Sequence, residues 1–189
     1  MKIVVLAAGE GKRMRPLTCS TPKPLLRFGG KTVLDHLFEA FPHEINEAVI
    51  VVKYLGDQIK EYCGSEFHGR KVSYIAGEMK GPGYDAHCAR HLVADGERFA
   101  IVYADEILNP ESVARCLEHE YSWLCFEVSE EKARESGVAV FGDSGRIKEV
   151  IEKPQQPPTN VVANGFMVAN TDVFNHLKRH KNGEYYLSD

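Results

Sequence analysis

The sequence predicts an α/β fold built on a mostly parallel sheet, with antiparallel strands added in the last third of the chain. Apolar runs without polar alternation, typical of strands buried on both faces, recur along the first 130 residues. Between them, apolar residues recur at helical spacing, which favours a sheet covered by helices. After about residue 136 the strands become short, and residues 142–145 and 154–158 interrupt them with glycine and proline.

The expected elements follow in chain order. Strands are predicted over residues 2–8, 48–52, 71–76, 99–104 and 123–128, with helices over residues 31–41, 57–63 and 85–94 and from Asn109-Pro110 onward. The alternation of strand and helix predicts that these strands are parallel, with helices on both faces. The last strands, over residues 137–141, 146–151 and 161–169, are expected to be antiparallel and to wall one side of a pocket.

Composition limits the classes of protein that the chain can belong to. Its 189 residues suit one domain, and 43% apolar content is enough for a core. A net charge of −4 argues against nucleic-acid binding. Five cysteines without a C-x-x-C pair disfavour a zinc site and indicate reduced, intracellular thiols. The apolar stretch of residues 3–8 is too short for a signal peptide or membrane span, so we expect a cytoplasmic protein.

The opening segment carries the strongest chemical signal. A strand leads into Gly9 and Gly11, where missing Cβ atoms let backbone amides approach a polyphosphate. Arg13 and Lys23 would bring positive charge to phosphate oxygens, although an ordinary turn with solvated cations has the same pattern. The third glycine of a dinucleotide fingerprint would fall at Met14, and the Gly11-Lys12 pair is not followed by Ser or Thr. Both NAD(P) and a Walker loop are therefore disfavoured.

Other candidate residues also follow predicted strands. Residues 9–13, residues 77–83 and Asp105 each fall at a carboxyl end, which predicts one shared cleft. Asp105 is a candidate Mg²⁺ ligand, with loop capping as the alternative. Glu152 and Lys153 would hold sugar hydroxyls and a phosphate, or form an exposed ion pair.

Two histidines stand at i, i+4, the spacing of paired ligands. These residues, His87 and His91, have no acidic general-base pattern beside them. We therefore expect them to lie on a helix surface.

The residues Ala8-Gly-Glu-Gly-Lys-Arg-Met-Arg-Pro-Leu-Thr18, followed by Pro22-Lys-Pro-Leu-Leu26, resemble the nucleoside-triphosphate transferase family that makes nucleotide sugars. The resemblance implies a three-layer Rossmann-like nucleotidyltransferase fold. It implies a single domain, with residues 1–130 binding the nucleotide and residues 131–189 binding a sugar phosphate and ending short at the C-terminus. The implied reaction joins an NTP and a sugar 1-phosphate to give an NDP-sugar and pyrophosphate.

The resemblance also implies roles for individual residues, carried over onto matching positions. Arg13 and Lys23 would be catalytic, and Asp105 would bind the cofactor Mg²⁺. The nucleotide would contact Leu6, Ala7, Ala8, Gly9, Gly11, Lys12, Arg13, Lys23 and Gly83. The sugar phosphate would contact Gly137, Glu152, Lys153 and Asn164. The expected partners are these two substrates, without nucleic acid or membrane, and a homo-oligomer is left open.

The chain departs from the family pattern at several positions. Ala104 replaces the glycine before Asp105, and Gly77 replaces a glutamine that would contact a pyrimidine base, so base preference stays open. The family's second metal-binding aspartate would lie beyond Asp189. Two alternatives stay open: a cytidylyltransferase acting on an alcohol phosphate such as phosphocholine, whose branch shares the N-terminal motif, and a non-catalytic regulatory subunit, which Ala104 and the short C-terminus favour. Retention of Arg13 together with Lys23 and Asp105 favours a catalyst.

Overall fold

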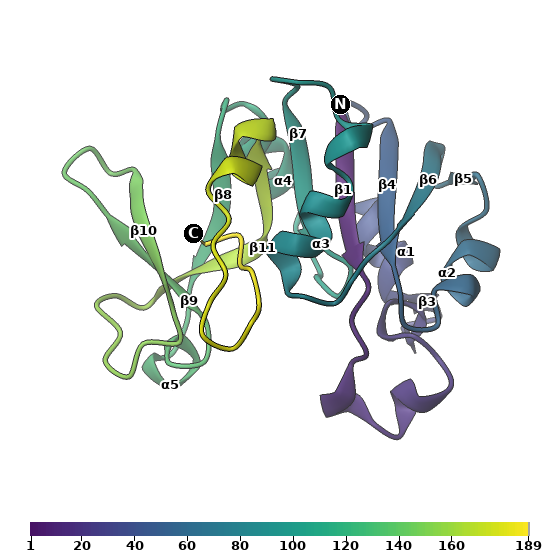
Figure 1. The fold of residues 1–189 in the computed structure, drawn as a ribbon, viewed down its shortest axis with the longest axis horizontal. Helices are drawn as coiled ribbons and strands as arrows, with labels where there is room; N and C mark the ends of the chain where they lie inside the picture. Colours follow the sequence, from purple (N-terminus) through teal and green to yellow (C-terminus); the bar gives the residue numbers. More distant parts are fainter. Residues whose placement is uncertain (189) are drawn as a thin grey trace.

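The computed structural model describes residues 1–188, except for the side chain of Asn164. It contains a nine-stranded sheet with the strand order β10-β9-β11-β7-β1-β4-β6-β5, and β8 pairs with β11 outside this path. Figure 1 shows helices on both faces of this sheet. The predicted α/β class, with a parallel part and later antiparallel strands, is confirmed.

The parallel part of the sheet determines where a ligand can bind. It consists of β1 (Lys2–Ala7), β4 (Glu47–Val52), β6 (Arg70–Ala76) and β7 (Phe99–Tyr103). β4 and then β6 follow on one side of β1, whereas β7 pairs with its other side. The order in which strands are added therefore switches from one side of β1 to the other, and the switch point lies between β1 and β7. In open α/β sheets ligands bind beyond the carboxyl ends of strands at such a switch point.

Two apolar layers hold the helices against the sheet. One face carries α1 (Val33–Glu39), α2 (Gly56–Cys63) and α4 (Pro110–Leu117), and the other carries α3 (Pro82–Cys88) and the 3₁₀ helix η5 (Thr171–Asn175). Ile3 and Val5 of β1 pack in the first layer, and Val4 packs in the second. This alternation follows from the two-residue period of a strand and explains why β1 is apolar throughout.

Side-chain caps fix where two of these helices begin. The Asn109 side chain accepts hydrogen bonds from the amides of Glu111 and Ser112 at 2.8 and 3.1 Å, so α4 begins where the sequence predicted. At α1, Thr32 and Asp35 form a reciprocal capping box. These local signals are the kind that a sequence pattern carries well.

The antiparallel part is built around one long strand. The strand β11 (Val161–Ala169) pairs antiparallel with β7, with β8 (Ser122–Glu127) and with β9 (Gly137–Phe141). β9 pairs in turn with β10 (Ile147–Glu152), and α5 (Glu130–Ala133) precedes β9. In Figure 1 the β9–β10 hairpin extends from the left side of the body.

Two expectations about these elements are wrong. β8 points the same way as β7 but is not paired with a parallel strand, because the antiparallel β11 lies between them; an apolar run specifies burial but not the pairing partner. The helix expected over residues 85–94 begins at Pro82 and ends at Cys88, followed by the 3₁₀ helix η4 (Arg90–Leu92). Its start follows from Pro82, whose fixed φ suits the first helical turn.

Short elements complete the described chain. They are the strands β2 (Arg27–Phe28), β3 (Lys31–Thr32) and β5 (Glu66–Phe67) and the 3₁₀ helices η1 (Lys12–Met14), η2 (Leu17–Cys19) and η3 (Lys23–Leu25). All five cysteines are free. Within residues 1–188, no helix is long and apolar enough to cross a membrane.

Candidate active site

A pocket of about 730 Å³ lies at the carboxyl ends of β1 and β7, where the strand order reverses. Most of its lining comes from the opening segment, and the rest comes from four separate parts of the chain. The lining residues are Leu6, Ala7, Gly9, Glu10, Gly11, Lys12, Arg13, Met14, Lys23, Pro24, Met79, Ala104, Asp105, Lys132 and Glu184. The cleft predicted from the strand ends therefore brings residues 9–13 and Asp105 together.

The turn after β1 is held from inside by Thr18 and requires a glycine. Gly11 has a φ of +61°, in the left-handed region, and its carbonyl accepts a 2.9 Å hydrogen bond from Thr18 Oγ1. A Cβ at position 11 would lie 3.0 Å from Thr18 Cγ2 and 3.3 Å from the Cβ of Lys23. The close packing places the turn directly against the residue that carries the Lys23 ammonium.

Lys23 and Asp105 meet across the pocket. The Lys23 ammonium forms an ion pair with a carboxylate oxygen of Asp105. Pro22 and Pro24 on either side of Lys23 are buried, so the backbone that carries the lysine is anchored. Both charged side chains keep about a third of their surface exposed, at 31% and 39%. They are therefore available to a ligand that enters the pocket.

The cations beside the turn differ in their surroundings. Arg13 is exposed and lines the pocket. Lys12 and Arg15 lie near the Glu10 carboxylate, with N···O distances of 3.4 and 3.0 Å. Glu10 offsets part of the positive charge of Lys12 and Arg15, whereas, in the described part of the chain, Arg13 and Lys23 line the cavity without an ion pair to Glu10.

Two predicted nucleotide contacts lie outside this lining. Ala8 is buried in the apolar layer that contains α3. Gly83 is buried and its amide donates to the carbonyl of Tyr185 at 2.9 Å. A Cβ on Gly83 would lie 2.8 Å from the carbonyl oxygen of Tyr186, so this glycine admits the backbone of residues 185–186. The space at Gly83 is therefore filled by the protein's own backbone.

The residues predicted to hold the sugar phosphate come from β9, β10 and β11. Gly137 and Glu152 are register partners at the end of the β9–β10 hairpin. Lys153 follows with a φ of +48°, and its amide donates to the carbonyl of Ser136 at 3.0 Å. Asn164 lies in β11, and its side chain is outside the described part of the structure. The hairpin thus places Gly137 beside Glu152, as two contacts to one ligand would require.

Tyr103 lies near carboxylates from both groups of residues. Burial raises the pKa of Tyr103, and the negative charges of Glu152, Glu106 and Asp105 raise it further. A Cβ at Gly165 would collide with the Tyr103 ring and would lie 2.8 Å from Glu106 Oε1. Gly165 therefore leaves room for the Tyr103 ring where β11 pairs with β7. This pairing places the end of β7 that precedes Asp105 beside the strand that carries Asn164.

Sequence patterns missed Lys132 and Glu184, which line the pocket, whereas Met79 falls within residues 77–83, which were expected at the cleft. Lys132 and Glu184 lie far from the opening motif in sequence, and neither belongs to a spacing that predicts chemistry. Lys132 comes from α5 of the antiparallel part. Glu184 belongs to residues 183–188, which bond both to residues 80–83 and to Glu152. Only a knowledge of the tertiary contacts would identify them.

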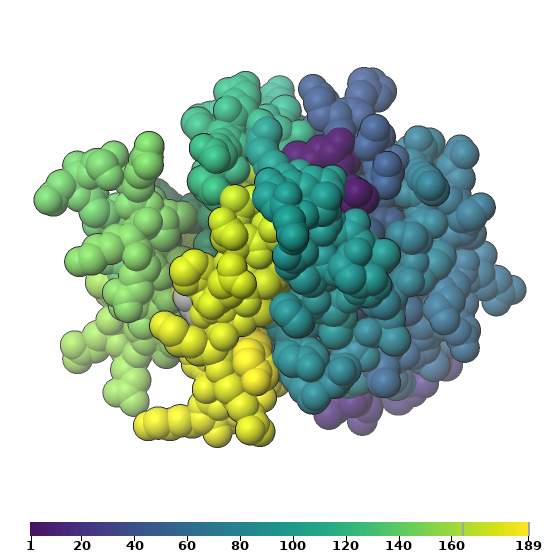
Figure 2. Space-filling view, turned by 45° about the horizontal axis from the view of Figure 1, so that its top comes forward, coloured from purple at the N-terminus to yellow at the C-terminus, as the bar shows by residue number. Residues whose placement is uncertain are grey.

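We name residues 183–188 the C-terminal segment. Tyr185 bonds to the Lys80–Gly83 loop through its backbone amide and carbonyl, both at 2.9 Å. At the other end of the segment, Ser188 Oγ donates to Glu152 Oε1 at 3.0 Å. In Figure 2 the end of the chain (yellow) lies between the region around α3 (teal) and the β9–β10 region (green). The segment therefore connects the two parts of the site.

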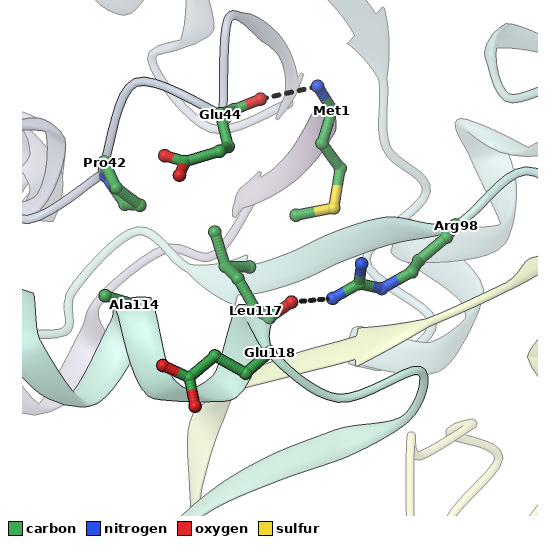
Figure 3. A pocket seen from close by; sticks show the side chains of 7 residues that line it. All are labelled: Met1, Pro42, Glu44, Arg98, Ala114, Leu117 and Glu118. Atoms are coloured by element: carbon green, nitrogen blue, oxygen red, sulfur yellow. Dashed lines mark hydrogen bonds between the residues drawn. The ribbon is translucent and has the colours of Figure 1, made fainter.

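A second pocket, of about 520 Å³, lies at the opposite edge of the sheet (Figure 3). Its lining includes Met1 and Glu44, at the amino ends of β1 and β4, together with Arg98 and the end of α4. The Met1 ammonium donates to the carbonyl of Glu44 at 2.5 Å, and Arg98 donates to the carbonyl of Leu117. With these cations already bonded to backbone, the pocket between β1 and β7 is the stronger candidate.

Comparison with known proteins gives one family throughout. A family model described as nucleotidyl transferase matches residues 2–189. The chain is 35% identical over 199 residues to the UTP–glucose-1-phosphate uridylyltransferase AglF of Haloferax volcanii, covering all of this chain and 81% of that protein. It is 30% identical to the bifunctional protein GlmU of Methanocaldococcus jannaschii, covering 45% of it. It is 29% identical to the mannose-1-phosphate guanylyltransferase catalytic subunit beta of Dictyostelium discoideum, over 94% of this chain and 52% of that one.

Solved structures support the same fold. UDP-glucose pyrophosphorylase in complex with UDP-glucose superimposes with a TM-score of 0.86 at 22% identity, covering the whole chain and 84% of that protein. The apo form of UDP-glucose pyrophosphorylase gives a TM-score of 0.80 at 21% identity. At these identities the likeness establishes the fold. The chain spans most of the Haloferax relative but about half of the GlmU and guanylyltransferase relatives.

Proposed function

Since this chain belongs to the nucleotidyl transferase family, we propose that it joins an NTP and a sugar 1-phosphate to give an NDP-sugar and pyrophosphate. The observation that carries the proposal is the meeting of the glycine turn, Lys23 and Asp105 in one pocket at the strand reversal. Backbone amides and two cations suit a triphosphate there, and the carboxylates on the other side suit a hydroxylated ring.

The reaction needs no covalent intermediate on the protein. A phosphate oxygen of the sugar 1-phosphate attacks the α-phosphorus of the NTP in line. The bond between the α-phosphorus and the bridging oxygen breaks, and pyrophosphate leaves with that electron pair. One phosphoanhydride replaces another, so we expect the reaction to be reversible. The contribution of the protein is to position both substrates and to neutralise charge.

Arg13 and Lys23 would carry out that neutralisation. Both line the pocket beside the turn that would hold the phosphates. In the structure Lys23 is paired with Asp105, which keeps its long side chain aimed into the cavity. A bound triphosphate would compete for the same ammonium. The ordered lysine then loses little side-chain entropy when it binds phosphate.

Mg²⁺ is part of the proposal, with Asp105 as the protein ligand. Among the described residues, no group of three or more His, Cys, Asp or Glu side chains could hold a metal ion without help. Mg²⁺ commonly binds through one or two carboxylates together with phosphate oxygens and water, so a single Asp105 fits a metal shared with the substrate. When bound, the ion would neutralise charge on the phosphates.

The sugar phosphate is proposed to bind at the β9–β10 side. Glu152 would accept hydrogen bonds from ring hydroxyls, and Gly137 beside it would allow the ring to approach the backbone. Lys153 would pair with the phosphate, and Asn164 is proposed as a further contact. Ser188 holds one oxygen of Glu152 and so limits the rotation of the carboxylate.

A substrate panel tests the proposal. The purified chain is incubated with Mg²⁺, each of the common NTPs and a set of hexose 1-phosphates, and pyrophosphate release and NDP-sugar formation are measured. Phosphocholine replaces the sugar phosphate in a parallel series. We expect release that depends on both an NTP and a hexose 1-phosphate.

Two outcomes would contradict this proposal. Turnover with phosphocholine alone would indicate a cytidylyltransferase for alcohol phosphates. Calorimetry that detects NTP uptake by a folded protein with no turnover in any mixture would indicate a regulatory subunit. Product identity, followed by chromatography, separates these cases from the expected one.

A further inference from the structure

Asp85 is a buried carboxylate for which the proposed reaction has no use. It lies in α3 with a relative exposure of 8%. Its Oδ1 atom accepts hydrogen bonds from the amides of Glu78 and Met79, at 2.9 and 3.0 Å. Burial raises the pKa of Asp85, and these two bonds act in the opposite direction. A buried carboxylate oxygen that accepts hydrogen bonds from two consecutive amides fixes the conformation of the backbone that carries those amides.

The packing around Gly77 brings this carboxylate close to the phosphate turn. A Cβ at position 77 would lie 2.8 Å from Asp85 Oδ1 and 2.9 Å from the Cβ of Ala8. Ala8 directly precedes Gly9, the first residue of the turn. Position 77 therefore has room only for glycine, and no side chain from that position can reach a bound nucleotide. Ligand contacts on this side must come from the residues that follow.

Met79, two residues after Gly77, is the residue of this loop that lines the pocket. It lines the same cavity as Gly9 and Arg13. Its φ is +58°, a left-handed conformation that costs a residue with a Cβ some free energy. The hydrogen bond from its amide to Asp85 offsets that cost and holds the conformation. Asp85 is thus coupled to the pocket through Met79 and not by direct contact.

We infer that Asp85 is a positioning residue that holds residues 77–79 in place as one wall of the nucleotide pocket. The inference rests on the proposed function, because it assigns this wall to the NTP. Asp85 itself touches no reacting atom. Its removal should weaken NTP binding and leave sugar-phosphate binding unchanged, because the contacts proposed for the sugar phosphate lie on β9, β10 and β11.

Two variants separate positioning from general stability. Asp85→Ala removes the acceptor of both amides. Asp85→Asn keeps one carbonyl oxygen, whose two lone pairs can accept both bonds, and so should restore most of the effect. Asp35→Ala is the matched control. Asp35 accepts backbone and side-chain hydrogen bonds at α1, and it does not line the pocket.

The first measurement is hydrogen exchange at the amides of residues 78 and 79, which requires no activity. We expect exchange at least about tenfold faster in Asp85→Ala than in the wild type or in Asp85→Asn. The second measurement is a KM for each substrate with the NTP that the wild type turns over. We expect Asp85→Ala to raise the KM for NTP about tenfold and to leave the sugar-phosphate KM within about twofold. Asp35→Ala should change neither KM.

The outcomes decide the inference and the proposed function separately. Equal exchange in the wild type and Asp85→Ala, or equal KM values for NTP, would overturn the positioning role. A parallel rise of both KM values in Asp85→Ala and Asp35→Ala would also overturn it, since that pattern reports destabilisation alone. A wild type inactive with every NTP would overturn the proposed function, and the exchange data would then still decide whether Asp85 holds the loop.

Discussion

The two sides of the candidate site are built in different ways. On the nucleotide side, most of the lining comes from one continuous stretch, residues 9–24, closed by the short-range bond between Thr18 and Gly11. On the sugar side, Gly137 and Glu152 meet only because β9 and β10 pair in one register. Ser188 then reaches Glu152 from 36 residues further along the chain.

This difference indicates how each side responds to change. A segment held by neighbouring residues keeps its shape when distant parts of the chain vary, so its chemistry can be encoded as a motif. A site assembled from several strands depends on each pairing, and a shift of one residue moves every side chain to the opposite face. We therefore expect substitutions on the nucleotide side to affect chemistry directly and those on the sugar side to affect affinity.

The largest expected effect is the loss of the charged pair that faces the nucleotide. Lys23→Ala and Asp105→Ala should each lower the rate of pyrophosphate release by on the order of 10²-fold or more. Lys23→Ala removes a cation that would offset the charge building up on the phosphates, and Asp105→Ala removes the proposed protein ligand of Mg²⁺. Steady-state pyrophosphate assays check this. Rates within a few-fold of the wild type for both variants would contradict a catalytic role for the pair.

The second-largest effect is expected at Gly11, where a matched control separates the effect of backbone strain from that of site geometry. Gly11→Ala places a Cβ against Thr18 and Lys23 in a left-handed backbone. We expect activity to fall on the order of tenfold, because small misplacements of a catalytic cation are costly. Gly29→Ala is the control, since Gly29 has a similar φ of +58° and an open surrounding. Each variant should lose about 1–2 kcal/mol of stability, measured by urea unfolding. Equal activity losses in both would contradict a specific role for the turn.

The meeting of the glycine turn, Lys23 and Asp105 in one cleft could be predicted from the sequence because the signals are local. The strand at residues 2–8, the glycine turn and the stiffened Lys23 are all encoded within about 25 residues, and Asp105 follows a strand whose apolar run marks it clearly. The sequence also predicted correctly that the helix α4 begins at Asn109. Each of these depends on steric or capping rules that operate within one or two turns of chain.

The features that the sequence did not predict depend on contacts between distant residues. The antiparallel strand β11 lies between β7 and β8, and no apolar pattern specifies that order. Lys132 enters the pocket only because α5 is anchored by the buried Ala133. Gly83 marks a close backbone approach, but the approaching chain is Tyr185–Tyr186. A glycine in sequence shows that space is needed and does not show what occupies it.

A smaller effect is expected on the sugar side. Ser188→Ala removes the hydrogen bond to Glu152 Oε1 and leaves the carboxylate freer to rotate. We expect the KM for the sugar phosphate to rise about threefold, the cost of one ordinary hydrogen bond, with the KM for NTP unchanged. Initial rates with each substrate varied at a saturating concentration of the other measure both constants, with Ser144→Ala, at the exposed β9–β10 turn, as the control. A rise in the NTP constant instead would show that the C-terminal segment acts mainly on the nucleotide loop.

The smallest effect on activity is expected for a carboxylate of the nucleotide side that lies away from the pocket. Burial acts to raise the pKa of Asp35, but hydrogen bonds from His68, Tyr62 and Thr32 outweigh it and hold that pKa well below its usual range. Asp35→Asn should leave both KM values unchanged. It should lower the free energy of unfolding at pH 7 by about 2 kcal/mol, because the charged form is the one that these donors stabilise.

The sign of the pH dependence tests this assignment. Since the folded-state pKa lies below the unfolded value, the stabilisation by Asp35 is complete above about pH 4 and declines as the pH falls further. The gap between wild type and Asp35→Asn, measured by urea unfolding, should therefore be about 1 kcal/mol smaller at pH 3 than at pH 7. A gap that is constant, or that widens in acid, would mean that the carboxylate does not owe its low pKa to the folded state. The capping box of α1 would then hold equally well without the charge.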